Sequence, residues 1–299
     1  MTAQATPSLV VAAHGRQVMV ETPSGERVRC QTRGKKSELV VGDRVHWSVT
    51  GDGGVVDARV PRRNLLYRQD DWRTKSFAAN LDLIVVMVAG EPMFSESQLA
   101  RALIAAQAEG IEVCIALNKT DLPAAATARE RLAPYRAMGV QNIELALKKD
   151  PTAALATLAP LLAGRTSLVL GPSGTGKSTL INLLVPAAAA QVGEISQALN
   201  SGRHTTTSTS WYWLDDTRQG ALIDSPGFQE FGLRQVSAEQ LASLMPDINA
   251  ALGACRFYNC THRQEPGCGV RAAAERGEIS PWRMRIYEEL YEELSRPRY

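Results

Sequence analysis

The sequence of 299 residues lacks several features that define large classes of protein. No apolar run approaches the ~18 residues that a membrane span requires, and the longest such run, 83–89, has the length of a strand. The first 15 residues show no basic start followed by a long apolar stretch, so we expect no export signal. Basic and acidic side chains nearly cancel, and the formal net charge of +2 identifies no partner. We therefore expect a cytoplasmic, monomeric protein that does not bind membranes.

Cysteine is scarce and unevenly placed. Of the five cysteines, Cys30 and Cys114 stand alone in strand-like surroundings. The other three share one short stretch with a histidine: Cys255, Cys260, His262 and Cys268. An odd count with one tight Cys/His cluster is typical of metal binding in a reducing compartment. Three thiolates and one imidazole complete the tetrahedral shell of Zn²⁺ and leave no position for water, so we predict one structural zinc ion. The alternative is three unligated thiols beside a chance histidine.

The charges are distributed unevenly along the chain. Residues 1–68 hold 11 basic and 6 acidic side chains, whereas 69–235 and 236–299 are each slightly acidic. Five short β-prone runs separated by turn signals fill 1–68 and predict a small barrel. Barrels of this size often bind single-stranded nucleic acid, so the basic side chains favour RNA binding, with a solvated structural surface as the alternative. The candidate phosphate contacts are Arg29, Arg33, Lys35, Lys36, Arg62 and Arg63.

The part of the chain after the barrel alternates apolar runs with helical stretches. We expect strands over 81–89, 111–117 and 166–170, paired strands over 211–214 and 221–223, and helices over 97–109, 129–138 and 177–184. This alternation predicts a parallel sheet covered by helices on both faces. The last part, 236–299, is predicted to be helical, because Ser280 before Pro281 marks a strong helix start. The predicted domains are therefore 1–68, 69–235 and 236–299.

The strongest motif is a glycine-rich run between the strand 166–170 and the helix 177–184. It fits the pattern Gly-x4-Gly-Lys-Ser/Thr, and its residues are Gly171, Pro172, Ser173, Gly174, Thr175, Gly176, Lys177, Ser178 and Thr179. Backbone N–H groups of such a loop, together with the helix N-terminus, hold phosphate oxygens. We predict that Lys177 reaches the β- and γ-phosphates and that Ser178 binds Mg²⁺. The alternative is a plain glycine-rich turn before a helix.

A second motif directly follows the strand 111–117, and it consists of Asn118, Lys119, Thr120 and Asp121. A carboxylate at this position can accept hydrogen bonds from both the ring N–H and the exocyclic amine of guanine. Adenine offers no such pair of donors, so an unpaired buried carboxylate would reject ATP. Alone, the tetrapeptide also fits a turn that starts a helix. Beside a phosphate-binding loop, the motif predicts a site that recognises guanine.

A third motif ends the strand 221–223. We predict that Asp224 holds Mg²⁺ through water and that the N–H of Gly227 senses the γ-phosphate. The polar run 202–207 lies between the first and third motifs, and Thr205 or Thr206 is a candidate to complete the Mg²⁺ shell. The alternative for these threonines is the entry to a strand.

The order of the motifs is unusual. In ordinary GTPases the phosphate loop comes first, whereas here 118–121 precede Gly171 by about fifty residues. A circular permutation would preserve the pocket, because folds tolerate moved termini at the surface. The chain also contains the motifs Gly-Arg-His-Thr-Thr-Thr (202–207) and Asp-Ser-Pro-Gly-Phe (224–228). With these motifs and this order, nearly the whole chain resembles the family of small-ribosomal-subunit-dependent GTPases called RsgA or YjeQ.

The resemblance implies a multidomain protein with an N-terminal OB-fold β-barrel, a central α/β P-loop GTPase domain that is circularly permuted, and a C-terminal α-helical zinc-binding domain. It also implies a role in late maturation of the small ribosomal subunit, with that subunit and its rRNA as partners and with GTP hydrolysis stimulated by the subunit. The chain departs from the family's pattern at the base-flanking motif. The best candidate for that motif, 145–147, contains no serine.

The residue that positions the attacking water is not evident from the third motif. Phe228 stands where many GTPases carry a water-orienting glutamine, and a phenyl ring cannot hydrogen-bond water. We therefore expect slow intrinsic hydrolysis, and we predict that His204 positions the water on a loop that the ribosomal partner orders. The alternative is that His204 is a surface loop residue.

The motifs together predict a GTP hydrolase that acts as a switch and uses Mg²⁺ with GTP. Two other functions stay open at this point. In a P-loop ATPase or kinase, the motif 118–121 would be accidental. In an RNA-binding module, GTP would bind without significant turnover.

Overall fold

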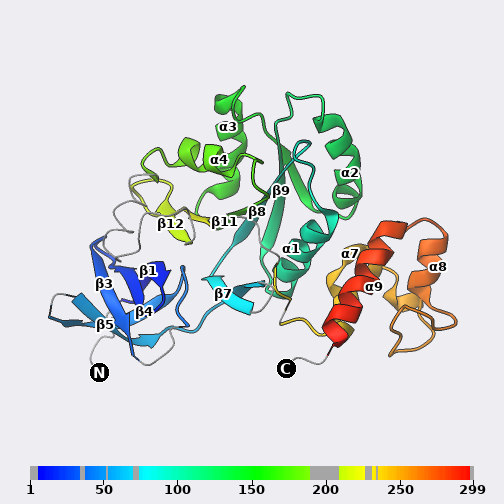
Figure 1. Cartoon of the computed structure of the whole chain (residues 1–299), viewed down its shortest axis with the longest axis horizontal. Coiled ribbons are helices and arrows are strands. Elements are labelled where there is room, and N and C mark those ends of the chain that lie inside the picture. Colours follow the sequence, from blue (N-terminus) through cyan, green and yellow to red (C-terminus); the bar gives the residue numbers. More distant parts are fainter. Residues whose placement is uncertain are drawn as a thin grey trace.

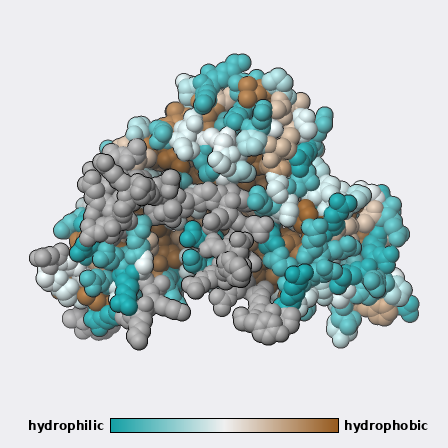
Figure 2. All heavy atoms as spheres, viewed as in Figure 1, coloured by the Kyte–Doolittle hydropathy of each residue, from teal (hydrophilic) through white to brown (hydrophobic). Residues whose placement is uncertain are grey.

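The computed structural model describes residues 6–33, 38–51, 53–69, 74–188, 209–225, 231–233 and 235–296. The N-terminal strands lie at one end of the long axis, the C-terminal helices lie at the other, and the central sheet lies between them (Figure 1). In the same view, the described surface over the C-terminal helices is mostly hydrophilic (Figure 2). Among the described residues, no helix has the length and apolar character needed to cross a membrane.

Five strands form the predicted barrel: β1 (Ser8–His14), β2 (Gln17–Glu21), β3 (Arg27–Thr32), β4 (Arg44–Thr50) and β5 (Gly53–Arg59). They pair in the order β1-β2-β3-β5-β4, and β4 returns to pair with β1, which closes the barrel. Alternate side chains point inward, so that Val10, Val18, Val20 and Val45 pack together in its interior. This order and closure match the OB fold.

The central sheet has the order β10-β9-β8-β11-β13-β12, and all neighbours are parallel except β12 and β13. Its strands are β8 (Leu83–Ala89), β9 (Glu112–Asn118), β10 (Gln141–Glu144), β11 (Thr166–Leu170), β12 (Ser210–Trp213) and β13 (Ala221–Asp224). Its helices are α1 (Glu96–Ala108), α2 (Ala125–Ala137), α3 (Pro151–Leu162) and α4 (Lys177–Leu184). In β8, Ile84 and Val86 pack with α1 and α2, whereas Val85 and Met87 pack with α3 and α4. The predicted parallel sheet with helices on both faces is confirmed.

The barrel and the central sheet are hydrogen-bonded to each other. Strand β12 pairs antiparallel with β1, in register Ala12 to Ser210, which makes one continuous sheet of eleven strands. The indole N–H of Trp213 donates to the Glu21 carboxylate at 2.6 Å. A hairpin of β6 (Leu65–Gln69) and β7 (Thr74–Ala79) connects the barrel to β8 along the chain. The barrel is therefore held against the central sheet by backbone pairing.

The C-terminal part is helical, as predicted, and contains short elements around the Cys/His cluster. These elements are α6 (Ala238–Leu241), η1 (Ala242–Leu244), α7 (Pro246–Asn249), η2 (Leu252–Ala254), α8 (Gly269–Glu275) and α9 (Pro281–Ser295). Helix α9 starts at Pro281 with Ser280 as its N-cap, which confirms the predicted start. Tyr287 and Leu290 are buried in the same hydrophobic cluster as residues of α1 and α6, so α9 packs against the central domain.

Candidate functional site

The glycine-rich run forms a loop between β11 and α4. Strand β11 ends at Leu170, and α4 begins at Lys177. Gly176 has a φ of +107°, and a β-carbon there would collide with the side-chain amide of Asn118. The Lys177 ammonium donates to the carbonyls of Gly171 at 2.6 Å and Pro172 at 2.9 Å, so it lies over the loop. The loop therefore has the backbone conformation and the basic side chain that phosphate binding requires.

The side chain of Asn118 joins three segments that are far apart in the sequence. Asn118 ends β9 and is 4% exposed. Its Nδ2 donates to the carbonyl of Thr175 in the glycine-rich loop at 2.8 Å. Its Oδ1 accepts from the backbone N–H of Leu147 at 3.2 Å. The motif 118–121, the glycine-rich loop and the loop after β10 therefore meet at one amide, although the first precedes the second along the chain.

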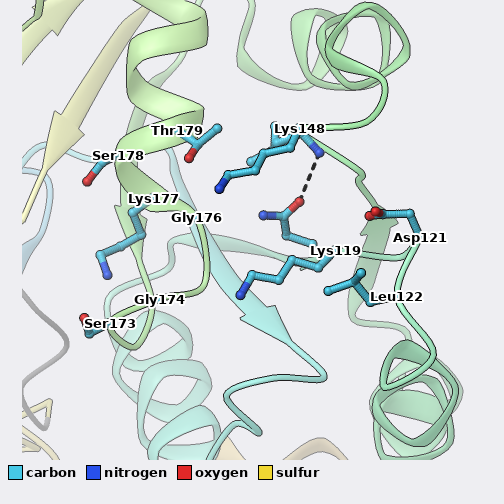
Figure 3. Close-up of a pocket in the computed structure, with 12 residues that line it drawn as sticks. Lys119, Asp121, Leu122, Lys148, Ser173, Gly174, Gly176, Lys177, Ser178 and Thr179 are labelled. Carbon is cyan, nitrogen blue, oxygen red and sulfur yellow. Dashed lines mark hydrogen bonds between the residues drawn. The ribbon is translucent and has the colours of Figure 1, made fainter.

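The three segments enclose a pocket of about 530 Å³. It is lined by Asn118, Lys119, Asp121, Leu122, Leu147, Lys148, Ser173, Gly174, Gly176, Lys177, Ser178 and Thr179. Figure 3 shows Asp121 and Leu122 on one side of the pocket, with Ser173, Lys177 and Ser178 on the opposite side. A ligand that spans the pocket would therefore meet a carboxylate at one end and the glycine-rich loop with its lysine at the other.

Asp224 lies at the phosphate-loop edge of the sheet. It ends β13 and is the register partner of Val169, two residues before Gly171. Burial raises the pKa of its carboxyl to about 6, although the nearby Lys177 ammonium opposes the shift. Burial also lowers the pKa of Lys177. A divalent cation held at this edge would favour the ionised form of the Asp224 carboxyl.

The loop that follows β10 contributes residues that the sequence motifs did not identify. The carbonyl of Leu145 accepts from the backbone N–H and from the hydroxyl of Thr120, at 3.1 and 3.0 Å. Residues 145–147 are the candidate base-flanking motif and contain no serine. Their backbone groups contact the motif 118–121. Lys148 follows directly, and its side chain crosses the pocket toward Thr179 on α4 (Figure 3). The one signal for Lys148 in the sequence was its position next to that degenerate motif.

Several residues that were predicted to bind nucleotide or RNA lie outside the described residues, and another has a different partner. Four candidates of the nucleotide site lie outside: His204, Thr205, Thr206 and Gly227. Lys35 and Lys36 of the barrel also lie outside. Arg62 was a candidate RNA contact, but its Nε and Nη2 donate to the two oxygens of the fully buried Asp43 carboxylate, at 2.6 and 2.8 Å. Arg62 is therefore a structural partner of the barrel.

The Cys/His cluster has the geometry of a tetrahedral metal site. The ligand atoms of Cys255, Cys260, His262 and Cys268 all lie within 4.8 Å of one another. The Nδ1 of His262 lies 3.5 Å from the Cys255 sulfur and 3.6 Å from the Cys268 sulfur. A tetrahedral ion bound at about 2.3 Å from sulfur and about 2.0 Å from nitrogen would separate these atoms by about 3.5 Å. The four residues fit one structural Zn²⁺.

The loop that carries the cluster is fixed by hydrogen bonds to its backbone. The Glu265 carboxylate accepts from the backbone N–H groups of Thr261, Arg263 and Gln264. Burial raises the pKa of Glu265, but the Thr261 hydroxyl and the backbone N–H groups of Thr261, Glu265 and Gln264 outweigh it and lower the pKa to about 2. The phenol of Tyr287 on α9 donates to the Thr261 carbonyl at 3.0 Å. The metal ligands are therefore tied to helix α9.

Known proteins are similar to this chain in sequence and in fold. Residues 59–234 match the family described as RsgA GTPase. A small ribosomal subunit biogenesis GTPase RsgA of Variovorax paradoxus is 60% identical over 296 residues, which cover 97% of this chain and 93% of that protein. The protein of the same name from Burkholderia pseudomallei is 53% identical over 289 residues, 96% of this chain and 91% of that one.

Two solved structures are also similar over the full length. YjeQ from Thermotoga maritima has a TM-score of 0.74 at 28% identity, covering 98% of this chain and 99% of that chain. YloQ, described as a circularly permuted GTPase, has a TM-score of 0.70 at 25% identity, covering 100% of this chain and 99% of that chain. The motif order of this chain indicated a circular permutation, and one of these two similar structures is described as circularly permuted.

Zinc removal tests the Cys/His cluster. We expect one zinc per chain in the purified protein, measured by atomic absorption. Cys268→Ser should lose the metal and lower the urea midpoint of the C-terminal helices, because metal binding contributes directly to the folding free energy. Cys114→Ala changes a buried cysteine in β9, outside the cluster, and should keep one zinc per chain. A native protein without zinc, and a stability that chelators do not change, would contradict the assignment.

Proposed function

Because the chain belongs to the RsgA GTPase family, we propose that it hydrolyses GTP as a switch in late maturation of the small ribosomal subunit. In this proposal the subunit is the partner that stimulates hydrolysis, and the protein binds its rRNA. The observation that carries the proposal is the amide of Asn118, which holds the motif 118–121 against the glycine-rich loop. The relatives that support it are named small ribosomal subunit biogenesis GTPases.

Guanine binds at the end of the pocket where Asp121 lies. Asp121 is exposed rather than buried, and no hydrogen bond or ion pair within the described residues involves its carboxylate. The carboxylate is therefore available to the two N–H donors of the guanine edge. Lys119 donates to the carbonyl of Glu91 at 2.8 Å, which fixes its side chain along the wall of the pocket. A bound base covers this carboxylate and removes it from water, and adenine lacks the donor pair that would replace the lost hydrogen bonds.

The phosphates bind at the opposite end. The N–H groups of Gly174 to Thr179 and the α4 N-terminus supply donors, and Lys177 exchanges its contacts with loop carbonyls for the β- and γ-phosphates. Ser178 and Asp224 would hold Mg²⁺, with Thr205 or Thr206 as a further candidate, and the N–H of Gly227 would sense the γ-phosphate. Mg²⁺ supplies charge neutralisation on the phosphoryl group when it is bound.

Lys148 contacts the middle of the nucleotide. Its side chain lies between the base end at Asp121 and the first turn of α4 (Figure 3). No hydrogen bond or ion pair within the described part of the chain involves its ammonium group. The ribose and the α-phosphate occupy the middle of a nucleotide, so the ammonium pairs with the α-phosphate.

Base selectivity tests the proposed role of Asp121. We expect Asp121→Ala to weaken GTP binding about 100-fold, because two hydrogen bonds to a charged group are lost, and to leave ATP binding unchanged. Isothermal titration calorimetry with both nucleotides measures this. Glu130→Ala removes an exposed carboxylate from the nearby helix α2 and should keep the wild-type ratio. A ratio of GTP to ATP affinity that Asp121→Ala does not change would favour a P-loop ATPase or kinase.

Lys148→Ala tests the contact with the α-phosphate. We expect about tenfold weaker binding of both GTP and GDP, as is typical for the loss of one charged hydrogen bond, and no change in the binding of guanosine. Lys149→Ala is the matched control, because Lys149 is the adjacent exposed lysine and does not line the pocket. Equal loss for guanosine and for GDP would contradict the phosphate contact.

His204→Ala tests the proposed catalytic residue. We expect GTP binding to stay intact and the hydrolysis stimulated by small subunits to be abolished, because positioning by a side chain contributes about 10²–10⁴-fold to such reactions. Turnover is measured with small subunits, with large subunits and with neither. Unchanged stimulation in His204→Ala would remove this residue from the mechanism. Absence of turnover in wild type under all three conditions would favour a GTP-binding RNA module.

A further inference from the structure

An arginine of helix α2 lies where two loops meet at the base end of the pocket. The Nε and Nη2 of Arg129 donate to the carboxylate oxygens of Glu144, the last residue of β10, at 2.8–3.0 Å. Its Nη2 also donates to the backbone carbonyl of Thr120 at 3.4 Å. Thr120 belongs to the motif 118–121, and Glu144 directly precedes the loop 145–147. One guanidinium therefore contacts both segments that adjoin the proposed guanine position.

The carbonyl that Arg129 binds belongs to the peptide unit between Thr120 and Asp121. A peptide unit is planar, so fixing the direction of its carbonyl also fixes the nitrogen and the α-carbon of the next residue. The backbone N–H and the hydroxyl of Thr120 are bound to the carbonyl of Leu145, at 3.1 and 3.0 Å. The carboxylate of Asp121 consequently projects from a backbone that is held on both sides of Thr120.

The motif needs such support because its backbone is strained one residue earlier. Lys119 has a φ of +61°, in the left-handed region that residues with a β-carbon rarely adopt. A free loop would relax toward ordinary backbone angles, and the direction of the following residues would change with it. The Lys119 ammonium is bound to the Glu91 carbonyl, and Arg129 holds the Thr120 carbonyl. The loop therefore keeps the conformation that places Asp121 at the pocket (Figure 3).

We propose that Arg129 is a positioning residue for base selectivity, which aims the Asp121 carboxylate at the guanine edge by holding the Thr120 carbonyl. The inference rests on the proposed function, because it requires guanine to bind at Asp121. Arg129 is not one of the residues that line the pocket. It acts through the backbone of the motif and makes no contact with the nucleotide.

A role confined to holding helix α2 on the sheet explains these contacts less well. The side chains of Arg129 and Glu144 are 39% and 44% exposed, and exposed ion pairs contribute little to stability. Helix α2 is attached to the sheet by buried side chains, among them Leu132 and Tyr135. The hydrogen bonds from Arg129 lower the pKa of Glu144, so the pair is ionised at neutral pH. A bidentate pair restricts the direction of the guanidinium, which suits the third bond to the motif.

The test compares nucleotide affinities in the full-length protein. We expect Arg129→Met to weaken GTP binding about tenfold, which corresponds to one hydrogen bond to a charged group, and to leave ATP binding within about twofold of wild type. Guanosine should lose the same factor as GTP, because the defect lies at the base and not at the phosphates. Isothermal titration calorimetry measures all three affinities.

Arg131→Met is the matched control. Arg131 lies two residues further along α2 and pairs with Glu96 of α1 at 2.8 Å, so the variant also removes an ion pair of this helix. This control should keep the wild-type ratio of GTP to ATP affinity. A control that lowers the ratio as much as Arg129→Met would overturn the inference.

A double-mutant cycle decides whether Arg129 acts through the Asp121 carboxylate. In the Asp121→Ala background, we expect Arg129→Met to change GTP affinity less than about twofold, because the group that it positions is gone. A further tenfold loss in the double variant, or wild-type selectivity in Arg129→Met, would overturn the inference. An equal loss of GTP and ATP affinity in Arg129→Met would also overturn it. If Asp121→Ala alone leaves the preference for GTP unchanged, the proposed function fails first, and the two failures are distinguished.

Discussion

The hydrogen bonds of the Asn118 side chain are the contacts on which the rest of the site depends. The amide donates to the glycine-rich loop and accepts from the loop after β10. Both partners are backbone groups, so the contacts depend little on the side chains of those loops. The close approach also requires a glycine at position 176, because any larger residue would displace the amide. A motif that comes early in the chain is thereby fixed beside one that comes later, and the permuted order leaves the pocket intact.

The sequence was sufficient to predict the elements whose patterning is local. The strand 166–170 and the helix 177–184 have the predicted bounds, because an apolar run, a glycine-rich loop and a helix start follow one another directly. The hairpin β6–β7 and the helix α3 were not predicted. Both depend on packing: Leu66 is fully buried only against the assembled core, and α3 covers the sheet face formed by β8. The domain boundaries after residues 68 and 235 stay predictions.

The candidate site was predictable where the chemistry requires particular residue types, and less so elsewhere. The four metal ligands and the pocket residues of the two main motifs come together as expected. Lys148 was missed because a lysine after a degenerate motif has no pattern of its own. Arg62 was misjudged as an RNA contact because its partner, the buried Asp43, lies nineteen residues away in the sequence. Charge counts along a chain do not reveal which basic side chains are already paired.

The central claim is that segments in reversed order bind one molecule of GTP. The most direct measurement is a crystal structure of the full chain with Mg²⁺ and a non-hydrolysable GTP analogue. The account predicts the guanine edge within hydrogen-bond distance of the Asp121 carboxylate and the phosphates on the backbone N–H groups of Gly174 to Thr179. A nucleotide bound outside this pocket, or bound in it with the guanine base away from Asp121, would contradict the account.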